Sequence, residues 1–169
     1  MQEQILEELD NTRSRLITAF TRFKNEEINI IPFEGSWTAA QLVEHILRSL
    51  KGVLKTLHGP VRETKRDPAA KVPMIRQTFL NLSTKFVAPD FLMPSNLHAN
   101  QEELVKSLEA KMKEISNAVH EVNLSETCLG HELPGAGAMT RLEWIYFVIY
   151  HSQRHTQQLE NIFGRVSVE

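Results

Sequence analysis

Four long segments of the chain carry apolar side chains at alternating steps of three and four residues. This spacing puts the side chains on one face of an α-helix. In the first segment it predicts a helix over about residues 2–26, and Pro32 with Gly35 then marks a connection. The stripe of this first helix consists of Ile5, Leu9, Thr12, Leu16, Ala19 and Phe23.

Each of the other three segments begins with a residue that can cap a helix, followed three positions later by Glu or Gln. The pairs are Thr38 and Gln41, Asn100 and Glu103, and Thr140 and Glu143. Such pairs are typical of helix N-termini because the two side chains bind the free backbone N–H groups there. Gly59 and Pro60 predict the end of the second long helix, and Gly164 predicts the end of the last one.

Residues 60–98 are the least regular part of the chain, with four prolines after Pro60. A short helix is expected at about residues 74–86, and the remainder predicts a long crossover of the kind that links helices of like direction. No alternation of apolar and polar residues competes with the helical stripes. The sequence therefore predicts an all-α protein, a four-helix bundle with a long crossover between helices 2 and 3, forming a single domain over residues 1–169.

Charge and composition exclude several classes of partner. The formal net charge is −2 and the sequence pI is about 6.4, so neither nucleic acid nor an anionic membrane surface is an expected partner. We find no signal-peptide pattern and no apolar run long enough to cross a membrane, which favours a cytoplasmic location. Cys128 is the only cysteine, and it is expected to be a small apolar side chain rather than a reactive thiol.

Three of the seven histidines interrupt the apolar stripes: His45, His151 and His155. The last two are four residues apart, so both rings lie on one helical face and can reach one metal ion. Burying imidazoles is costly unless each finds a partner, and a shared ion would supply one. Three neutral histidine ligands would also leave a coordination position open for water or substrate. Spacing alone leaves two other readings, surface histidines and core histidines, because it cannot prove that the helices face each other.

Two short motifs, in helix order, extend this argument. The first reads Trp37-Thr38, Leu42 and His45, and the second reads Glu143-Trp144, His151-Ser-Gln-Arg154-His155 and Gln158. Together they resemble the DinB/YfiT-like superfamily, and the loop from His131 to Gly135 is similar to a turn that many members place before the last helix. The resemblance implies a four-helix bundle, often a homodimer, whose three histidines bind one divalent metal ion. The implied ligands are His45, His151 and His155.

The resemblance also implies a class of activity. Some members are S-transferases that use a low-molecular-weight thiol such as bacillithiol or mycothiol, and we expect this activity with a small-molecule substrate. The alternatives are a metal-dependent hydrolase and a non-catalytic bundle that the metal only stabilises. Zinc or nickel is the expected ion, although three imidazoles also suit iron, cobalt and copper. The sequence assigns no catalytic residue.

Five further residues near the motifs could contribute to the site. Gln158, one turn beyond the last histidine, is either a partner of that ligand or a polar end of the core stripe. Arg154 is either an anion anchor or, more simply, an ion pair with a neighbouring helix. Trp37 could line a pocket, and His131 could approach the metal from its loop. Glu44 could act as a general base, but its position predicts an exposed side chain.

Overall fold

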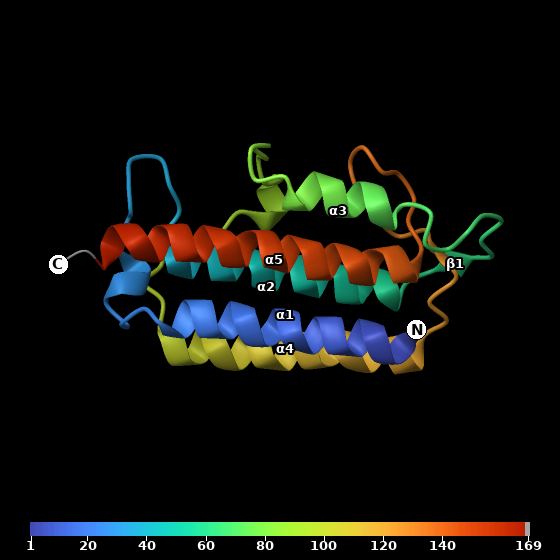
Figure 1. The fold of residues 1–169 in the computed structure, drawn as a ribbon, viewed down its shortest axis with the longest axis horizontal. Helices are drawn as coiled ribbons and strands as arrows, with labels where there is room; N and C mark the ends of the chain where they lie inside the picture. The colour runs from blue at the N-terminus through green and yellow to red at the C-terminus, as the bar shows by residue number, and fades with distance from the viewer. Residues whose placement is uncertain (168–169) are drawn as a thin grey trace.

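The computed structural model describes residues 1–167, which form a bundle of four long helices (Figure 1). The helices are α1 (Gln2–Thr21), α2 (Ala39–Leu57), α4 (Gln101–Glu121) and α5 (Arg141–Val166). Helix α1 packs against α4 and α5, and α2 packs against the same two helices. The predicted all-α four-helix bundle is therefore confirmed.

The crossover lies between two helices that run in the same direction. Helices α2 and α4 are parallel in Figure 1, as are α1 and α5, so the chain must return along the whole bundle before α4 begins. The crossover contains β1 (Val61–Arg62), α3 (Val72–Leu80) and the 3₁₀ turn η2 (Asp90–Leu92). Helix α3 packs along α5, and residues 82–97, here called the strap, follow it.

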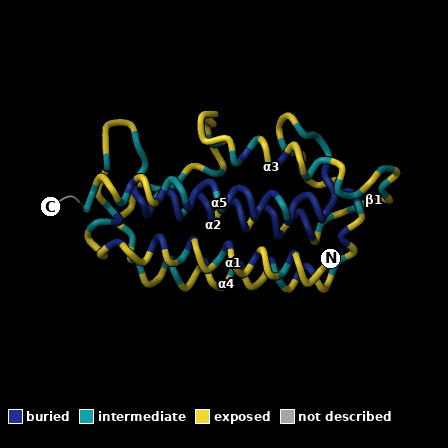
Figure 2. The backbone as a smooth tube through the Cα atoms, viewed as in Figure 1, coloured by how far each residue is buried: buried dark blue, intermediate teal, exposed yellow. Residues whose placement is uncertain are grey.

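The apolar stripes meet in one continuous core. All six residues of the predicted α1 stripe are buried, although the last of them lies beyond the helix end. Figure 2 shows α5 as dark blue over most of its length, whereas the outer faces of α1 and α4 are exposed. Helix α5 is the most buried because α1, α2 and α3 all pack against it. This central position explains why polar side chains on α5 must find partners inside the protein.

The predicted caps are present. Thr38 and Gln41 form a capping box at α2, and Thr140 and Glu143 form another at α5. The side chain of Asn100 accepts a hydrogen bond from the backbone N–H three residues later, at the start of α4. These local bonds determine where α2 and α5 begin. The start of each helix in turn determines how far along the bundle its histidines lie.

Helix α1 ends at Thr21, five residues before the predicted end. The cause is a long-range partner: the side-chain amide of Gln101 donates to the carbonyls of Phe20 and Phe23 and so satisfies the last turn. A separate 3₁₀ turn, η1 (Glu27–Asn29), follows. The stripe continued into Phe23 because that ring still packs into the core after the helix has stopped.

Helix α3 covers residues 72–80 rather than the predicted 74–86. It begins early because Pro73 occupies the first turn, where a missing N–H costs nothing. It stops at Asn81, where the guanidinium of Arg154 on α5 binds the carbonyls of Phe79 and Asn81. These bonds satisfy carbonyls that the end of a helix leaves without internal partners.

Two smaller differences concern the second half of the chain. Helix α5 runs through Gly164 to Val166, so the prediction that Gly164 ends it is wrong. The backbone of Gly164 does not adopt a positive φ, and the helix continues as it would through any residue. A two-stranded antiparallel pairing of β1 with β2 (Thr127–Cys128) also ties the crossover to the loop before α5.

Within residues 1–167 no helix is both long and apolar enough to cross a membrane.

Candidate metal centre

The packing of α2 against α5 brings the three predicted histidines together. The side chains of His45, His151 and His155 are only 5%, 8% and 7% exposed. The Nε2 atom of His151 lies 3.3 Å from that of His45 and 3.0 Å from that of His155. One potential ligand atom from each ring lies within 4.8 Å of the other two. The inner-face positions read from the sequence therefore correspond to one buried cluster.

Hydrogen bonds on the far side of two rings determine which nitrogen faces the cluster. Nδ1 of His45 lies 3.0 Å from the carbonyl oxygen of Leu92, and Nδ1 of His155 lies 2.6 Å from Oε1 of Gln158. A carbonyl oxygen only accepts, so each Nδ1 carries the hydrogen and each neutral ring turns a lone pair on Nε2 towards the centre. Nε2 of His151 can donate at most one hydrogen, either to His45 or to His155. The Nε2 lone pair of at least one of these two rings is therefore left without a donor.

The cluster also favours the neutral form of all three rings. Burial lowers the pKa of His45, although the bond to Leu92 opposes the effect. Burial and the neighbouring rings lower the pKa of His151 well below its usual value, and burial with His45 lowers that of His155 to about 3. Neutral imidazole is the form that binds metal ions. The three rings are therefore ready to bind a cation at neutral pH without first losing protons.

The spacing of the nitrogens fits a single metal ion. Metal–nitrogen bonds of about 2.0–2.1 Å place neighbouring ligand nitrogens roughly 2.8–3.4 Å apart at the angles of octahedral or tetrahedral sites. The two Nε2 separations from His151, 3.0 and 3.3 Å, fall in this range, and the nitrogens of the third pair lie within 4.8 Å of each other. Within the described residues no Cys, Asp or Glu joins the cluster. Three protein ligands leave a position for a small molecule, which is the pattern of catalytic rather than structural sites.

Comparison with known proteins identifies the family. The family model described as the DinB superfamily matches residues 8–159, which include all three histidines. The chain belongs to the DinB superfamily. A solved structure, "Crystal structure of TT2238, a four-helix bundle protein", is similar in fold, with a TM-score of 0.60 and 16% sequence identity over 95% of this chain and 99% of that chain. No curated protein matches the sequence significantly.

Of the residues predicted to surround the centre of this DinB-superfamily chain, two contact a ligand. The side chain of Gln158 accepts from His155, as described above. The indole of Trp37 lies 5.1 Å from the ring of His45, measured between centroids, and lines the hollow above the cluster. Membership of the family and the three-histidine cluster are together compatible with a metal-binding protein.

Arg154 makes a different contact from the ion pair that the sequence favoured. Its guanidinium donates to the carbonyls of Phe79, Asn81 and Thr84 and lies 4.8 Å from the ring centre of Phe86. The side chain therefore fastens the end of α3 and the start of the strap onto α5. An arginine that binds three backbone carbonyls leaves no sequence signature, because any residue type supplies the same acceptor.

His131 lies away from the metal cluster. Its ring packs 5.7 Å from Trp144 and 6.0 Å from Phe91, and the residue is exposed on the loop before α5. It lines the hollow but does not belong to the group of converging ligand atoms. The structure thus places His131 at the entrance and not among the ligands.

Glu44 and Cys128 are both structural. Oε1 of Glu44 accepts from Arg48, and Oε2 accepts from the backbone and hydroxyl of Ser95, so both carboxylate oxygens are engaged. Cys128 is completely buried on β2, and burial raises the pKa of its thiol to about 11. Neither side chain is suited to act as a base or nucleophile.

Sequence reasoning missed the aromatic wall around His151. The ring of Phe79, from α3, lies 5.8 Å from that of His151, and the ring of Phe147, one turn earlier on α5, stacks on it at 4.9 Å. The position of Phe79 depends on how α3 docks on α5, which the spacing of residues within α3 does not determine.

Proposed function

We propose that this protein is a divalent-metal-dependent S-transferase, an enzyme that joins a low-molecular-weight thiol through its sulfur to a small electrophile. The observation that supports the proposal is the convergence of three neutral, buried imidazoles that line one hollow. Residues 1–167 supply no fourth ligand, so a thiol has a place to bind. Zinc or nickel is the ion we propose.

A bound ion would act as a Lewis acid and lower the pKa of a thiol coordinated beside the imidazoles. The protein's own residues prepare the site for this task. The carbonyl of Leu92 and the amide of Gln158 hold the two outer rings in the tautomer that turns Nε2 inwards. The rings of Trp37, Phe79 and Phe147 cover the imidazoles and exclude water from their edges.

The carboxylates around the hollow favour a transferase over a hydrolase. Attack by water commonly needs a general base, whereas a thiol acidified by coordination needs none. Glu44 is fully engaged by Arg48 and Ser95. Among the described residues that line the hollow, the only carboxylate is that of Glu160, which is exposed on α5. Among the described residues, no carboxylate is therefore positioned as a base that faces the cluster.

The proposed reaction balances without a redox partner. The thiol sulfur forms a bond to an electrophilic carbon, the bond from that carbon to its leaving group breaks, and the leaving group departs with the electron pair. The thiol proton passes to solvent. With 1-chloro-2,4-dinitrobenzene as the probe electrophile, the products are an aryl thioether and chloride.

The first experiment measures metal content in protein purified without an affinity tag or chelator. About one equivalent of metal is expected in the wild type, and its loss is expected in His45→Ala, His151→Ala and His155→Ala. His120→Ala is the matched control, because His120 is exposed at the end of α4 and should leave the metal in place. A wild type that binds no metal, even after dialysis against zinc or nickel, would contradict the proposal.

The second experiment tests the reaction itself. The metal-loaded protein is mixed with the probe electrophile and, in separate assays, cysteine, glutathione, bacillithiol or mycothiol, and thioether formation is followed by absorbance. Faster transfer with at least one thiol, lost in His151→Ala but kept in His120→Ala, is the expected result. Full metal occupancy with no transfer from any of these thiols would instead favour a bundle that the metal only stabilises.

A further inference from the structure

Six exposed apolar side chains gather on one side of the bundle. They are between 42% and 95% exposed, and five of them belong to the strap. The six residues are Phe33, Leu82, Phe86, Val87, Phe91 and Met93. Single exposed apolar residues are normal on a protein surface, but a contiguous group of this kind marks a binding site.

This apolar surface is concave and ends at the metal cluster. All six residues line the same hollow of about 2130 Å³ that His45, His151 and His155 line. The ring of Phe86 stacks on that of Phe79 at 5.5 Å, and Phe79 in turn packs against His151. The aromatic surface thus continues from the solvent to a metal ligand. Because the hollow reaches three imidazoles, part of it can hold a small molecule beside them.

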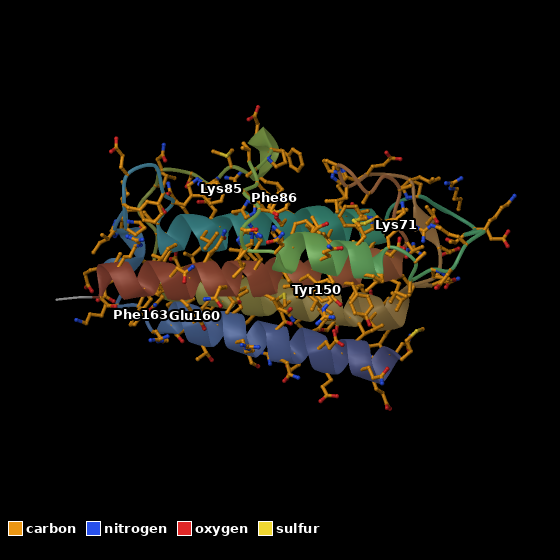
Figure 3. All side chains as sticks on the ribbon, turned by 45° about the horizontal axis from the view of Figure 1, so that its top comes forward. Lys71, Lys85, Phe86, Tyr150, Glu160 and Phe163 are labelled. Carbon is orange, nitrogen blue, oxygen red and sulfur yellow. The ribbon has the colours of Figure 1, made fainter. Side chains whose placement is uncertain are left out.

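Most of the charges around the hollow are positive. Four basic residues line it, Lys55, Lys85, Arg154 and Arg165, against the single acidic residue Glu160. The chain as a whole carries a formal net charge of −2, so this local excess of positive charge is opposite to the average. Figure 3 shows Lys85 next to Phe86 on the side of the bundle that carries the strap. Charges of one sign around an apolar cleft attract ligands of the opposite sign.

From these observations we infer that the electrophilic substrate is an organic anion with a sizeable apolar body. Its apolar part lies against Phe86 and Phe91, its reactive carbon reaches the thiol sulfur held beside the imidazoles, and its anionic group stays at the rim near Lys85 and Arg165. The inference rests on the proposed function, because it identifies the class of substrate of the same site.

Binding can be measured without the reaction, because both tryptophans of the protein report on the hollow. Trp37 and Trp144 both line it, so their fluorescence should change when a ligand enters. Three probes of similar size and different charge are titrated: 4-butylbenzoate, 4-butylbenzyl alcohol and 4-butylbenzylamine. The benzoate is expected to bind at least fivefold more tightly than the alcohol, and the amine is expected to bind most weakly.

Matched variants separate the two parts of the inference. Lys85→Glu should weaken benzoate binding at least fivefold and leave the alcohol nearly unchanged, whereas Lys113→Glu, on the exposed face of α4, should change neither. Phe86→Ser and Phe91→Ser should weaken both ligands. Leu97→Ser is the control, because Leu97 is 81% exposed but does not line the hollow.

Each titration is repeated on metal-free and zinc-loaded protein. The metal content and the sedimentation coefficient of every variant are also measured, to report zinc binding and oligomeric state. Preference for the benzoate without metal supports the inference even where the transfer assay fails. Equal or tighter binding of the alcohol or the amine would overturn it while leaving a zinc site intact. Failure of all probes to bind, together with a dimer that Phe86→Ser and Phe91→Ser dissociate, would show that a second copy covers the hollow and would equally overturn it.

Discussion

The imidazole of His45 is hydrogen-bonded to the carbonyl of Leu92 at 3.0 Å, although 47 residues separate the two in sequence. The same face of α2 holds the strap at a second place, where Glu44 accepts from Ser95 and Gln41 donates to the carbonyl of Ser95. The proposed metal ligand His45 and the segment that covers it are therefore connected by hydrogen bonds.

This connection predicts that metal binding orders the strap. An ion on Nε2 of His45 makes the opposite N–H a stronger donor to Leu92. Hydrogen–deuterium exchange of the amides in residues 82–97 should slow at least threefold when zinc is added, with little change in the exposed half of α4. In His45→Ala the response should vanish. Equal exchange with and without zinc in the wild type would show that the strap is independent of the metal.

Gln158 is predicted to tune metal affinity through His155. Gln158→Leu removes the acceptor that fixes the ring, and loss of such a partner typically weakens binding by about 10- to 100-fold. Gln157→Leu is the control, because the neighbouring amide reaches Asn161 on the helix surface instead of a ligand. Affinity is measured by competition with a chromogenic chelator. If the two variants bound zinc equally well, Gln158 would have no part in holding the ligand.

Arg154 is predicted to stabilise the fold, in addition to adding a positive charge near the site. Arg154→Met keeps much of the apolar stem but leaves three carbonyls, at the end of α3 and the start of the strap, without their charged donor. We expect the free energy of unfolding to fall by about 2–4 kcal/mol in urea. Arg165→Met, an exposed arginine on the same helix, should cost less than about 1 kcal/mol. Similar losses in both would contradict a fastening role.

Glu143 is completely buried and forms a two-pronged ion pair with Arg66. Burial raises the pKa of Glu143, but hydrogen bonds from Arg66 and from the backbones of Thr140 and Lys71 outweigh burial, and the net pKa is lowered. Breaking a buried pair is costly, and Arg66 is partly exposed, so Glu143→Gln is expected to cost about 2–4 kcal/mol at pH 7.

The lowered pKa fixes the pH dependence of that loss. Because the folded-state pKa lies below the unfolded value of about 4.3, the carboxylate stabilises the fold fully above that pH and progressively less as acid is added. Urea unfolding of the wild type and Glu143→Gln should therefore differ by a constant amount from pH 5 to 8 and converge below about pH 4. The exposed Glu132→Gln serves as the control. A gap that widened in acid would refute the assigned ion pair.

Local features of the fold could be predicted because they depend on neighbours in sequence. The stripe of α1 and the capping boxes at Thr38 and Thr140 involve residues no more than four apart, and the structure confirms them. The ends of α1 and α3 could not be predicted, because Gln101 and Arg154 reach them from distant helices. Capping from outside the element overrides its own pattern.

The candidate site divides in the same way. That His151 and His155 lie on the same face of α5 follows from their spacing in the sequence. That His45 lies next to them depends on the packing of α2 against α5. The partners Leu92 and Phe79 come from the crossover, and their roles arise from a backbone carbonyl and from the docking of a short helix. Neither produces a periodicity that a single sequence can show.

The parallel arrangement of α2 and α4 has a consequence for the stage of folding at which the proposed ion could bind. His45 and His151 are 106 residues apart, and the whole crossover and α4 lie between them. Contacts at such separations form late in folding, after the cost of closing the intervening loop has been met. A chain folded only as far as α1 and α2 offers a single imidazole of the centre. The ion is therefore expected to bind a nearly complete bundle rather than to nucleate its folding. It would slow unfolding of the native state without speeding folding.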